Sequence, residues 1–329
     1  MLRAYFREGD RLVPRDIDVN TARNLEPAVW YSLLDPTPDE DHFVEECLGV
    51  SIPTRMEMRD IEPSARLYTD NGAEFVTLTV LISSDHEEPA KTSVTFVLKG
   101  EQLVTVRYAD PRPFRLFEGA VQKPGFPGLI TGEMVMLAIL EAIIDRLAAL
   151  LETVGDDIDH ISREVFGNKS KRPDRKSRDL QSLIERIGKK GDVLTLARES
   201  LVSIVRLAGY HQAVEREVTK LARERKQGIR IIQRDAAALG DHAAFLSNKI
   251  NFLLDATLGL INLEQNQIIK IFSVAAVVFL PPTLVASIYG MNFHIMPELS
   301  WPFGYPLAIL LMIVSAVLPF LFFKRRGWL

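Results

Sequence analysis

Several patterns typical of enzymes and metal sites are missing from this sequence. Cysteine occurs once, as Cys47, so the chain has neither an intrachain disulfide nor a CxxC metal site. The six histidines are scattered without the spacing of a zinc-hydrolase helix. A glycine-rich phosphate loop and a nucleophile elbow are also lacking. We therefore expect no enzyme activity and no organic cofactor.

The charge pattern also lacks the signals of a nucleic-acid-binding protein and of a signal peptide. The net charge is −4, so the chain as a whole lacks the basic character of a nucleic-acid-binding protein, and no nucleic-acid partner is expected. The N-terminus has charges where a signal peptide has its apolar region. A basic cluster at residues 169–178 is interpreted as the solvated tip of a helix hairpin. A membrane-surface or polynucleotide role for that cluster stays open.

Two long runs near the C-terminus contain no charged residue. The first extends from Ile271 to Ile288, and as a helix its 18 residues measure about 27 Å, close to the hydrocarbon thickness of a membrane. The second, from Trp301 to Phe323, has aromatic residues near both ends. We predict two transmembrane helices. The alternative of two buried helices in a soluble core fits poorly with their pairing at the end of the chain.

Basic residues flank this pair of runs on the outside only. Lys270 precedes the first run and Lys324-Arg325-Arg326 follow the second, whereas the loop between them has no Lys or Arg and one acidic residue, Glu298. The positive-inside rule therefore places both outer ends in the cytoplasm. We expect cytoplasmic N- and C-termini and an outward-facing loop.

The residues before about 128 show the pattern of an α/β domain. Short β-branched and aromatic segments predict four strands, and Gly100-Glu101 predicts a tight hairpin turn. Two further segments are predicted to be helices that cover the sheet. The strands are expected at residues 28–34, 75–82, 93–98 and 103–107, and the helices at residues 37–48 and 53–61.

Beyond a Pro- and Gly-rich break at residues 123–128, the chain becomes helical. Apolar residues recur every three or four positions from Gly132 to Val165, from about Arg178 to Tyr210, and from about Asp235 into the first apolar run. The predicted fold class is an α+β membrane protein with an N-terminal α/β cytosolic domain, a long helical stalk and two C-terminal transmembrane helices. The predicted boundaries are 1–128 for the α/β domain, 129–265 for the long helices, 266–289 for the first span, 290–300 for the external loop, 301–323 for the second span and 324–329 for the basic C-terminus.

Transport through such a protein requires several copies, because two packed helices leave no lumen. One face of the first span is polar at both ends and small or apolar in the middle. Polar residues in membrane spans usually face a bundle interior or water, although small hydroxyls also simply join helices. Pro281-Pro282 predicts a kink in this span. The stripe consists of Asp255, Asn262, Asn266, Ile269, Ser273, Ala276, Leu280, Thr283 and Ser287.

The loop after the first span carries a specific motif. It begins Tyr289-Gly290-Met291-Asn292-Phe293 and continues with Met296-Pro297-Glu298-Leu299. Together with residues 278–287 and the ending at 322–329, this motif closely resembles the CorA family of magnesium and cobalt channels, whose signature is Gly-Met-Asn at the outer end of the first of two C-terminal spans. The order of domains is similar over the full length, and the match is closest to the proteobacterial branch.

The resemblance implies a funnel-shaped homopentamer in which five first spans line the pore. At the matching positions, Gly290, Met291 and Asn292 form the expected outer selectivity site. The other expected roles are pore constrictions at Leu280 and Thr283, a cytoplasmic gate at Asn266, Ile269 and Phe272, an inner mouth at Asp255, and a cation-gathering ring in the external loop at Glu298.

The chemistry of the motif suits Mg²⁺. This ion releases its water reluctantly, so neutral Asn292 carboxamides can accept hydrogen bonds from the hydrated ion without trapping it. The resemblance implies passive Mg²⁺ influx, driven by the membrane potential, across a bacterial inner membrane. Co²⁺ and Ni²⁺ are possible further ions, and the expected partners are lipid and other copies of the chain. Two alternatives stay open: a zinc transporter with the same two-span plan, and a membrane-anchored scaffold that conducts nothing.

The resemblance also implies that cytosolic Mg²⁺ regulates the channel through acidic sites between subunits. The expected helix-hairpin tip is basic in this chain, so no carboxylates can be assigned to that role from the sequence. Candidates on the first long helix are Asp145, Glu152, Asp156 and Asp157.

Overall fold

The structure, a computed structural model, describes two compact units of the chain. The first unit comprises the described residues of 1–170 and 182–253, and the second comprises those of 171–181 and 254–328. Two long helices contribute residues to both units. The described residues are 1–9, 11–20, 26–60, 62–82, 89–123, 131–167, 173–214, 220–292, 296–297 and 301–328.

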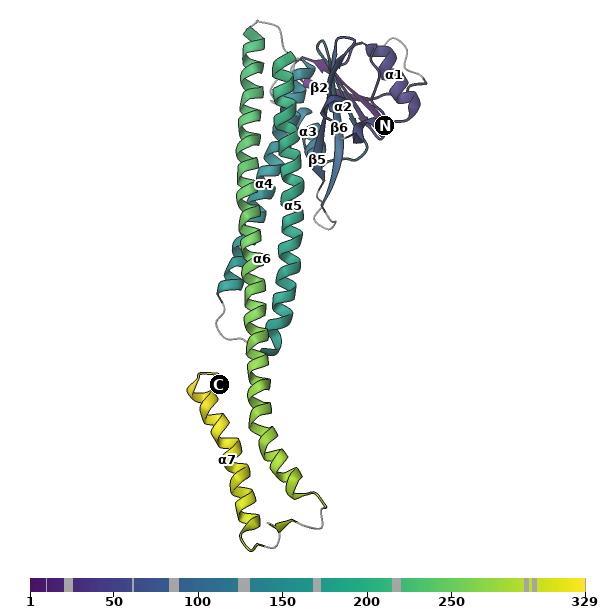
Figure 1. The fold of residues 1–329 in the computed structure, drawn as a ribbon. Coiled ribbons are helices and arrows are strands. Elements are labelled where there is room, and N and C mark those ends of the chain that lie inside the picture. The colour runs from purple at the N-terminus through teal and green to yellow at the C-terminus, as the bar shows by residue number, and fades with distance from the viewer. Residues whose placement is uncertain are drawn as a thin grey trace. The chain divides into compact units, whose positions relative to one another are not determined.

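A seven-stranded sheet belongs to the first unit (Figure 1). The central neighbours β3 and β7 are parallel, and the other paired strands are antiparallel. The predicted strands correspond to β3, β5, β6 and β7. The hairpin prediction is confirmed, because Gly100 has a φ of 59° between β6 and β7. In spatial order the strands are β2 (Arg11–Asp16), β1 (Leu2–Glu8), β3 (Trp30–Leu34), β7 (Gln102–Arg107), β6 (Ala90–Lys99), β5 (Ala73–Ile82) and β4 (Leu67–Asp70).

Sequence analysis missed several elements and misassigned one. It missed β1, β2, β4, the four-residue helix α2 (Pro63–Arg66) and helix α3 (Arg112–Val121). The missed strands are short or carry charged residues, whereas α3 has buried apolar residues at helical spacing, at Phe114, Phe117 and Val121, that the analysis overlooked. The helix predicted at residues 53–61 is wrong, since that stretch contains only a 3₁₀ turn, η1, at Glu57–Arg59. Thr54 N donates to Glu57 Oε2 at 2.8 Å, as at a helix start, but the chain extends again at Asp60.

Helices cover both faces of the sheet. On one face, α1 (Pro38–Leu48) contributes Val44 and Leu48 to a core that includes Leu33 and Val104 of the sheet. On the other face, Phe117 of α3 packs against Trp30. The helix prediction for residues 37–48 is confirmed: Thr37 Oγ1 accepts from Glu40 N at 3.3 Å, while Glu40 Oε2 accepts from Thr37 N at 2.9 Å.

Four longer helices complete the structure (Figure 1). The helix predicted from Gly132 to Val165 is confirmed as α4, and it starts tightly against the sheet, since a Cβ on Gly132 would lie 2.4 Å from Leu103 N. The second predicted helix begins earlier than expected, and so does the third; much of the basic 169–178 segment lies outside the described residues. The helices are α4 (Gly132–Phe166), α5 (Pro173–Val214), α6 (Lys220–Tyr289) and α7 (Gly304–Arg325).

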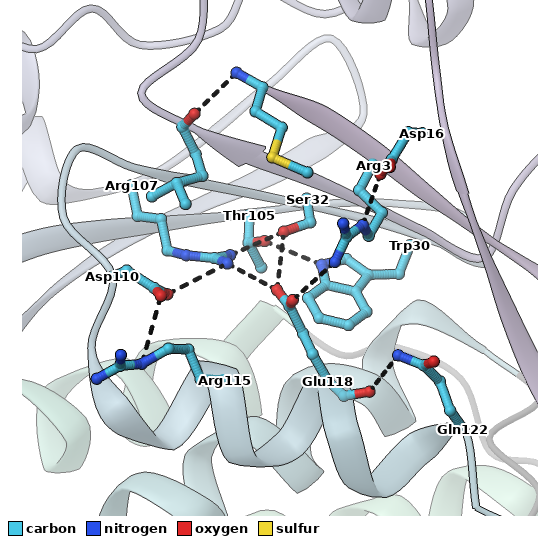
Figure 2. Close-up of polar contacts among 12 residues, drawn as sticks. Arg3, Asp16, Trp30, Ser32, Thr105, Arg107, Asp110, Arg115, Glu118 and Gln122 are labelled. Atoms are coloured by element: carbon cyan, nitrogen blue, oxygen red, sulfur yellow. Dashed lines mark hydrogen bonds and ion pairs between the residues drawn. The ribbon is translucent and has the colours of Figure 1, made fainter.

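A buried arginine joins the sheet to α3 (Figure 2). The side chain of Arg107 is 2% exposed, and its Nη2 donates to Glu118 Oε1 at 2.7 Å while Nη1 donates to Ser32 Oγ at 2.8 Å. Asp110 lies farther away, with its Oδ1 3.7 Å from Arg107 Nη2. A buried guanidinium is costly without an opposite charge, so the position of α3 depends on Glu118.

A buried histidine joins the helices to another strand of the sheet. His211, in the last turn of α5, has a side chain that is 6% exposed. Its Nδ1 lies 2.8 Å from Glu74 Oε2 on β5, and its Nε2 lies 3.2 Å from Glu133 Oε1 in the first turn of α4. Burial by itself lowers the pKa of His211, but the hydrogen bonds to Glu133 and Glu74 outweigh it and raise the pKa to about 9.

Replacing Glu118 by alanine should destabilise the first unit, because Arg107 would then be a buried charge without its main partner. We expect a loss of about 2–4 kcal/mol in the free energy of unfolding, measured by thermal or denaturant unfolding of the detergent-solubilised protein. The matched control is Glu8→Ala, which removes an exposed pair with Arg15 (2.7 Å) and should cost less than about 1 kcal/mol. Equal losses in the two variants would contradict this role of Glu118.

Stability should also depend on the charge of His211. Because its pKa is higher in the folded state than the ordinary value near 6.5, its contribution is complete below that value and is lost as the pH rises through about 9. The thermal midpoint of the wild-type protein should therefore fall by several degrees more between pH 6.5 and 9.5 than that of His211→Gln. In His160→Gln, which alters an exposed pair with Glu164, the thermal midpoint should fall with pH as much as it does in the wild type. Parallel curves for all three proteins would refute the prediction.

Candidate ion pathway

The second unit contains two helices that are long and apolar enough to cross a membrane. The candidate spans lie in α6 and α7. Of the residues in the most apolar 18-residue stretch of each helix, only 6% in α6 and 0% in α7 are buried. Large side chains are exposed in both, for example Phe272 at 72% and Leu318 at 63%. Exposed apolar surface of this extent marks contact with lipid or with another protein. The prediction of two membrane-inserted helices is supported by these observations.

The predicted pore residues share one exposed face of α6. At 100° per residue their positions fall within an arc of about 120°. The opposite face is less exposed: Val274 is 4% exposed, and Val278, Pro281 and Val285 are half-buried. The exposed residues are Asp255, Asn266, Ile269, Phe272, Ser273, Ala276, Leu280, Thr283 and Ser287.

The two prolines in α6 do not end the helix. Pro281 and Pro282 remove two backbone donors, yet α6 continues to Tyr289. In the turn that follows, Thr283 Oγ1 donates to Phe279 O at 2.7 Å. Figure 1 shows α6 bending toward its C-terminal end, in agreement with the expected kink.

The Gly-Met-Asn motif follows α6 directly. Gly290 N donates to Ala286 O at 3.0 Å, and a Cβ on Gly290 would lie only 3.1 Å from that oxygen. Glycine therefore suits this tight helix end. Met291 and Asn292 come next and are both exposed. The expected external ring residue Glu298 lies outside the described residues, as do residues 293–295.

Sequence reasoning overlooked one favourable feature of the motif. The C-terminal end of a helix carries a partial negative charge, because its last carbonyl groups have no partner within the helix. α6 ends at Tyr289, so this end lies next to Asn292. The helix end and the carboxamide both offer oxygen atoms to a cation. The signal was present in the sequence as Gly290, a residue that commonly follows the end of a helix.

Cationic side chains gather at the other ends of the two spans. Lys270 Nζ lies 6.0 Å from the ring centroid of Trp328, which follows α7. Arg326 Cζ lies 5.2 Å from the ring centroid of Phe322. The contact between Lys270, which precedes the apolar run of α6, and Trp328, which follows α7, agrees with a hairpin that has both outer ends on one side of the membrane.

The candidate regulatory carboxylates lie on α4, and one of them is paired with a lysine. Asp157 Oδ2 forms a 2.5 Å ion pair with Lys190 Nζ. Burial and the nearby negative charges of Asp145 and Asp235 raise the pKa of Glu141, another carboxyl group of α4. Within the part of the chain that the structure describes, no three His, Cys, Asp or Glu side chains are placed to hold a metal ion. The regulatory site therefore stays a prediction.

Comparison with known proteins agrees with this arrangement. The model of the CorA-like Mg²⁺ transporter protein family matches residues 26–325. The chain is 35% identical over 329 residues to the magnesium transport protein CorA of Haemophilus ducreyi. It is 36% identical over 336 residues to the magnesium transport protein CorA of Escherichia coli strain K12. Each match covers 100% of this chain and 100% of the relative.

A solved structure shows the same fold. The complete CorA magnesium transporter from Methanocaldococcus jannaschii superposes with a TM-score of 0.76, at 19% identity, over 100% of this chain and 99% of that one. Its similarity extends over both units and includes the two C-terminal apolar helices. By its sequence, and in agreement with its fold, the chain belongs to the CorA-like Mg²⁺ transporter family.

Proposed function

We propose that copies of this chain form a channel through which Mg²⁺ passes into the cytoplasm of a bacterium across the inner membrane. The full-length relatives that bear the name magnesium transport protein support this function. The observation that carries the proposal is the exposed stripe of α6, which leads from Asp255 to the Gly-Met-Asn motif at residues 290–292.

Assembly around an axis turns this stripe into a pathway. One chain exposes every residue of the stripe, whereas Val274 on the opposite face is buried and Val278, Pro281 and Val285 are half-buried. Rotational symmetry places the same α6 face of every copy toward the centre, where polar groups meet water instead of lipid. We propose the funnel-shaped homopentamer that the family resemblance implies, with both termini in the cytoplasm.

Selectivity then depends on Asn292 at the outer mouth. A ring of neutral carboxamides accepts hydrogen bonds from the water shell of Mg²⁺, and the negative ends of the α6 helices add attraction without a fixed charge. A carboxylate at the same place would hold the ion too firmly for release. Glu298 in the external loop gathers cations ahead of this ring.

The middle of the pathway is suited to a gate. Asn266, Ile269 and Phe272 form the cytoplasmic gate, and Leu280 and Thr283 narrow the pore farther out. The apolar side chains of Ile269, Phe272 and Leu280 close it by excluding water. The membrane potential drives entry, at about 4.6 kcal/mol per 100 mV for a divalent ion. Cytosolic Mg²⁺ acts as the regulator in this proposal, and Co²⁺ and Ni²⁺ are further permeant ions.

Replacing Asn292 by alanine should abolish Mg²⁺ influx into proteoliposomes, since it removes the only side chain of the motif that can accept hydrogen bonds from hydrated Mg²⁺. Influx is followed with a Mg²⁺-sensitive dye under an inside-negative potential, and particle size is measured in detergent. The control Asn20→Ala changes an exposed asparagine of the first unit and should leave influx unchanged. Normal influx in Asn292→Ala would reject the selectivity role.

The same assay separates this proposal from its two alternatives. Competition among Mg²⁺, Co²⁺, Ni²⁺ and Zn²⁺ identifies the preferred ion, and preference for Zn²⁺ would favour the zinc transporter. A wild-type protein that conducts none of these ions would favour the membrane-anchored scaffold.

Replacing Phe272 by alanine should produce a leaky pore. The smaller side chain widens an apolar ring and lets water enter it, so the closed state loses its barrier. We expect Mg²⁺ influx to persist when the lumen of the liposomes already contains millimolar Mg²⁺, a condition that should close the wild-type channel. The control Phe320→Ala removes the same volume from α7, outside the stripe, and should keep wild-type regulation. Equal closure of both variants would argue against a gate at Phe272.

A further inference from the structure

A large cleft lies within the first unit between the sheet and the long helices. Its volume is about 820 Å³, and its walls come from the end of α2 (Pro63–Arg66), β4, β5 and β6 on one side and from α5 and α6 on the other. Small-molecule sites typically have volumes of about 300–1,000 Å³. The cleft is therefore large enough for a ligand the size of a nucleotide.

The cleft opens where strand β4 ends. β4 pairs with β5 only at residues 73–76. The rest of β5 pairs with β6 on one edge, and no strand of the described sheet pairs with its other edge. Ser203 of α5 replaces part of the missing pairing, since its Oγ accepts a hydrogen bond from Thr79 N at 3.1 Å. Farther along the cleft α5 carries the small residues Gly191 and Thr195, and a Cβ on Gly191 would lie 4.0 Å from Ile250 of α6.

The α5 face that lines the cleft is polar along its length. Leu194, Leu201 and Ile204 on other sides of α5 are buried at 0–1% exposure and form its packing surface. The cleft side instead presents Arg198 and Arg206, which are both exposed. The cleft is therefore a polar surface with its own composition and is not an incompletely filled part of the apolar core.

Positive charge dominates the walls of the cleft. Lys91 Nζ and Glu199 Oε2 form a 2.7 Å ion pair and offset each other. Three arginines are left, and Arg66 is held in place because its Nη1 donates to Thr79 Oγ1 at 3.1 Å. Arg198 and Arg206 form no ion pair with any residue that the structure describes. This local excess of positive charge lies in a chain whose net charge is −4.

We propose that this cleft binds a phosphate-bearing small anion of nucleotide size. The guanidinium groups of Arg66, Arg198 and Arg206 hold the phosphates, because their planar forks match phosphate oxygens in pairs of hydrogen bonds. The hydroxyl groups of Thr195 and Ser247 on the same walls donate to carbonyl groups of their own helices, Thr195 Oγ1 to Gly191 O at 3.0 Å and Ser247 Oγ to Ala243 O at 2.9 Å, so the arginines are the phosphate donors. The apolar side chains of Leu67, Val202 and Ile250 can contact the uncharged part of the ligand. Binding requires neither a pore nor an ion gradient, so its test is independent of transport.

The test is calorimetric titration of the full-length, detergent-solubilised protein with ATP, tripolyphosphate, inorganic phosphate and adenosine in buffer free of divalent cations. We expect ATP and tripolyphosphate to bind and adenosine not to bind. The double variant R198Q/R206Q should weaken ATP binding by about tenfold or more, because each phosphate loses charged hydrogen bonds. The control Arg230→Gln removes one exposed positive charge from α6 outside the cleft and should bind ATP as the wild type does.

Three results would overturn the proposal. The first is absence of binding by both ATP and tripolyphosphate, or equal ATP affinity in R198Q/R206Q and the control. The second is binding of adenosine as tightly as ATP, which would exclude recognition of phosphate. The third is a change in the particle size of R198Q/R206Q without a change in its affinity for ATP. That result would identify the cleft as a contact between copies of the chain. Inorganic phosphate that binds as tightly as ATP would support the phosphate site and restrict it to single phosphate groups.

Discussion

The preference of Mg²⁺ for water and oxygen is the constraint on which this protein depends. Hydrocarbon supplies neither, and a hairpin of two helices encloses no lumen. The oxygen-bearing and small residues of the predicted stripe lie on one exposed face of α6, while Val274 on its other face is buried. Exposure of the polar residues in a single chain is costly in lipid. The assembly proposed above would remove this cost and create a hydrated pathway in the same step.

The first unit is held together by buried charges at the places where helices meet the sheet. Arg107 and Glu118 join β7 to α3, and His211 joins α5 to β5 and α4. Such pairs contribute little net stability compared with apolar packing, but they are very sensitive to the loss of one partner. They therefore specify which helix lies on which part of the sheet. The same meeting of sheet and helix leaves the basic cleft open beside Ser203.

Much of the site could be predicted because it depends on short stretches of sequence. The apolar runs, the stripe from Asp255 to Ser287 and the motif at residues 290–292 are all contained in α6 and the residues next to it. Helical periodicity and composition are sufficient to identify such features. The helix predicted at residues 53–61 is wrong because a local pattern was misleading. Thr54 and Glu57 form the hydrogen bond of a helix start, but the residues that follow do not continue the helix.

By itself the sequence determined the order of the elements, the two apolar spans, their flanking charges and the family motif, because each is a local property of consecutive residues. Only the tertiary structure decided which distant residues meet. His211 and Glu74 are 137 residues apart in the chain, and Ser203 and Thr79 are 124 apart. Contacts of this kind depend on how the sheet and the helices pack. That packing cannot be inferred from the pattern of residues that are neighbours in the sequence. The histidine bridge, the buried arginine and the basic cleft were therefore visible only in the folded chain.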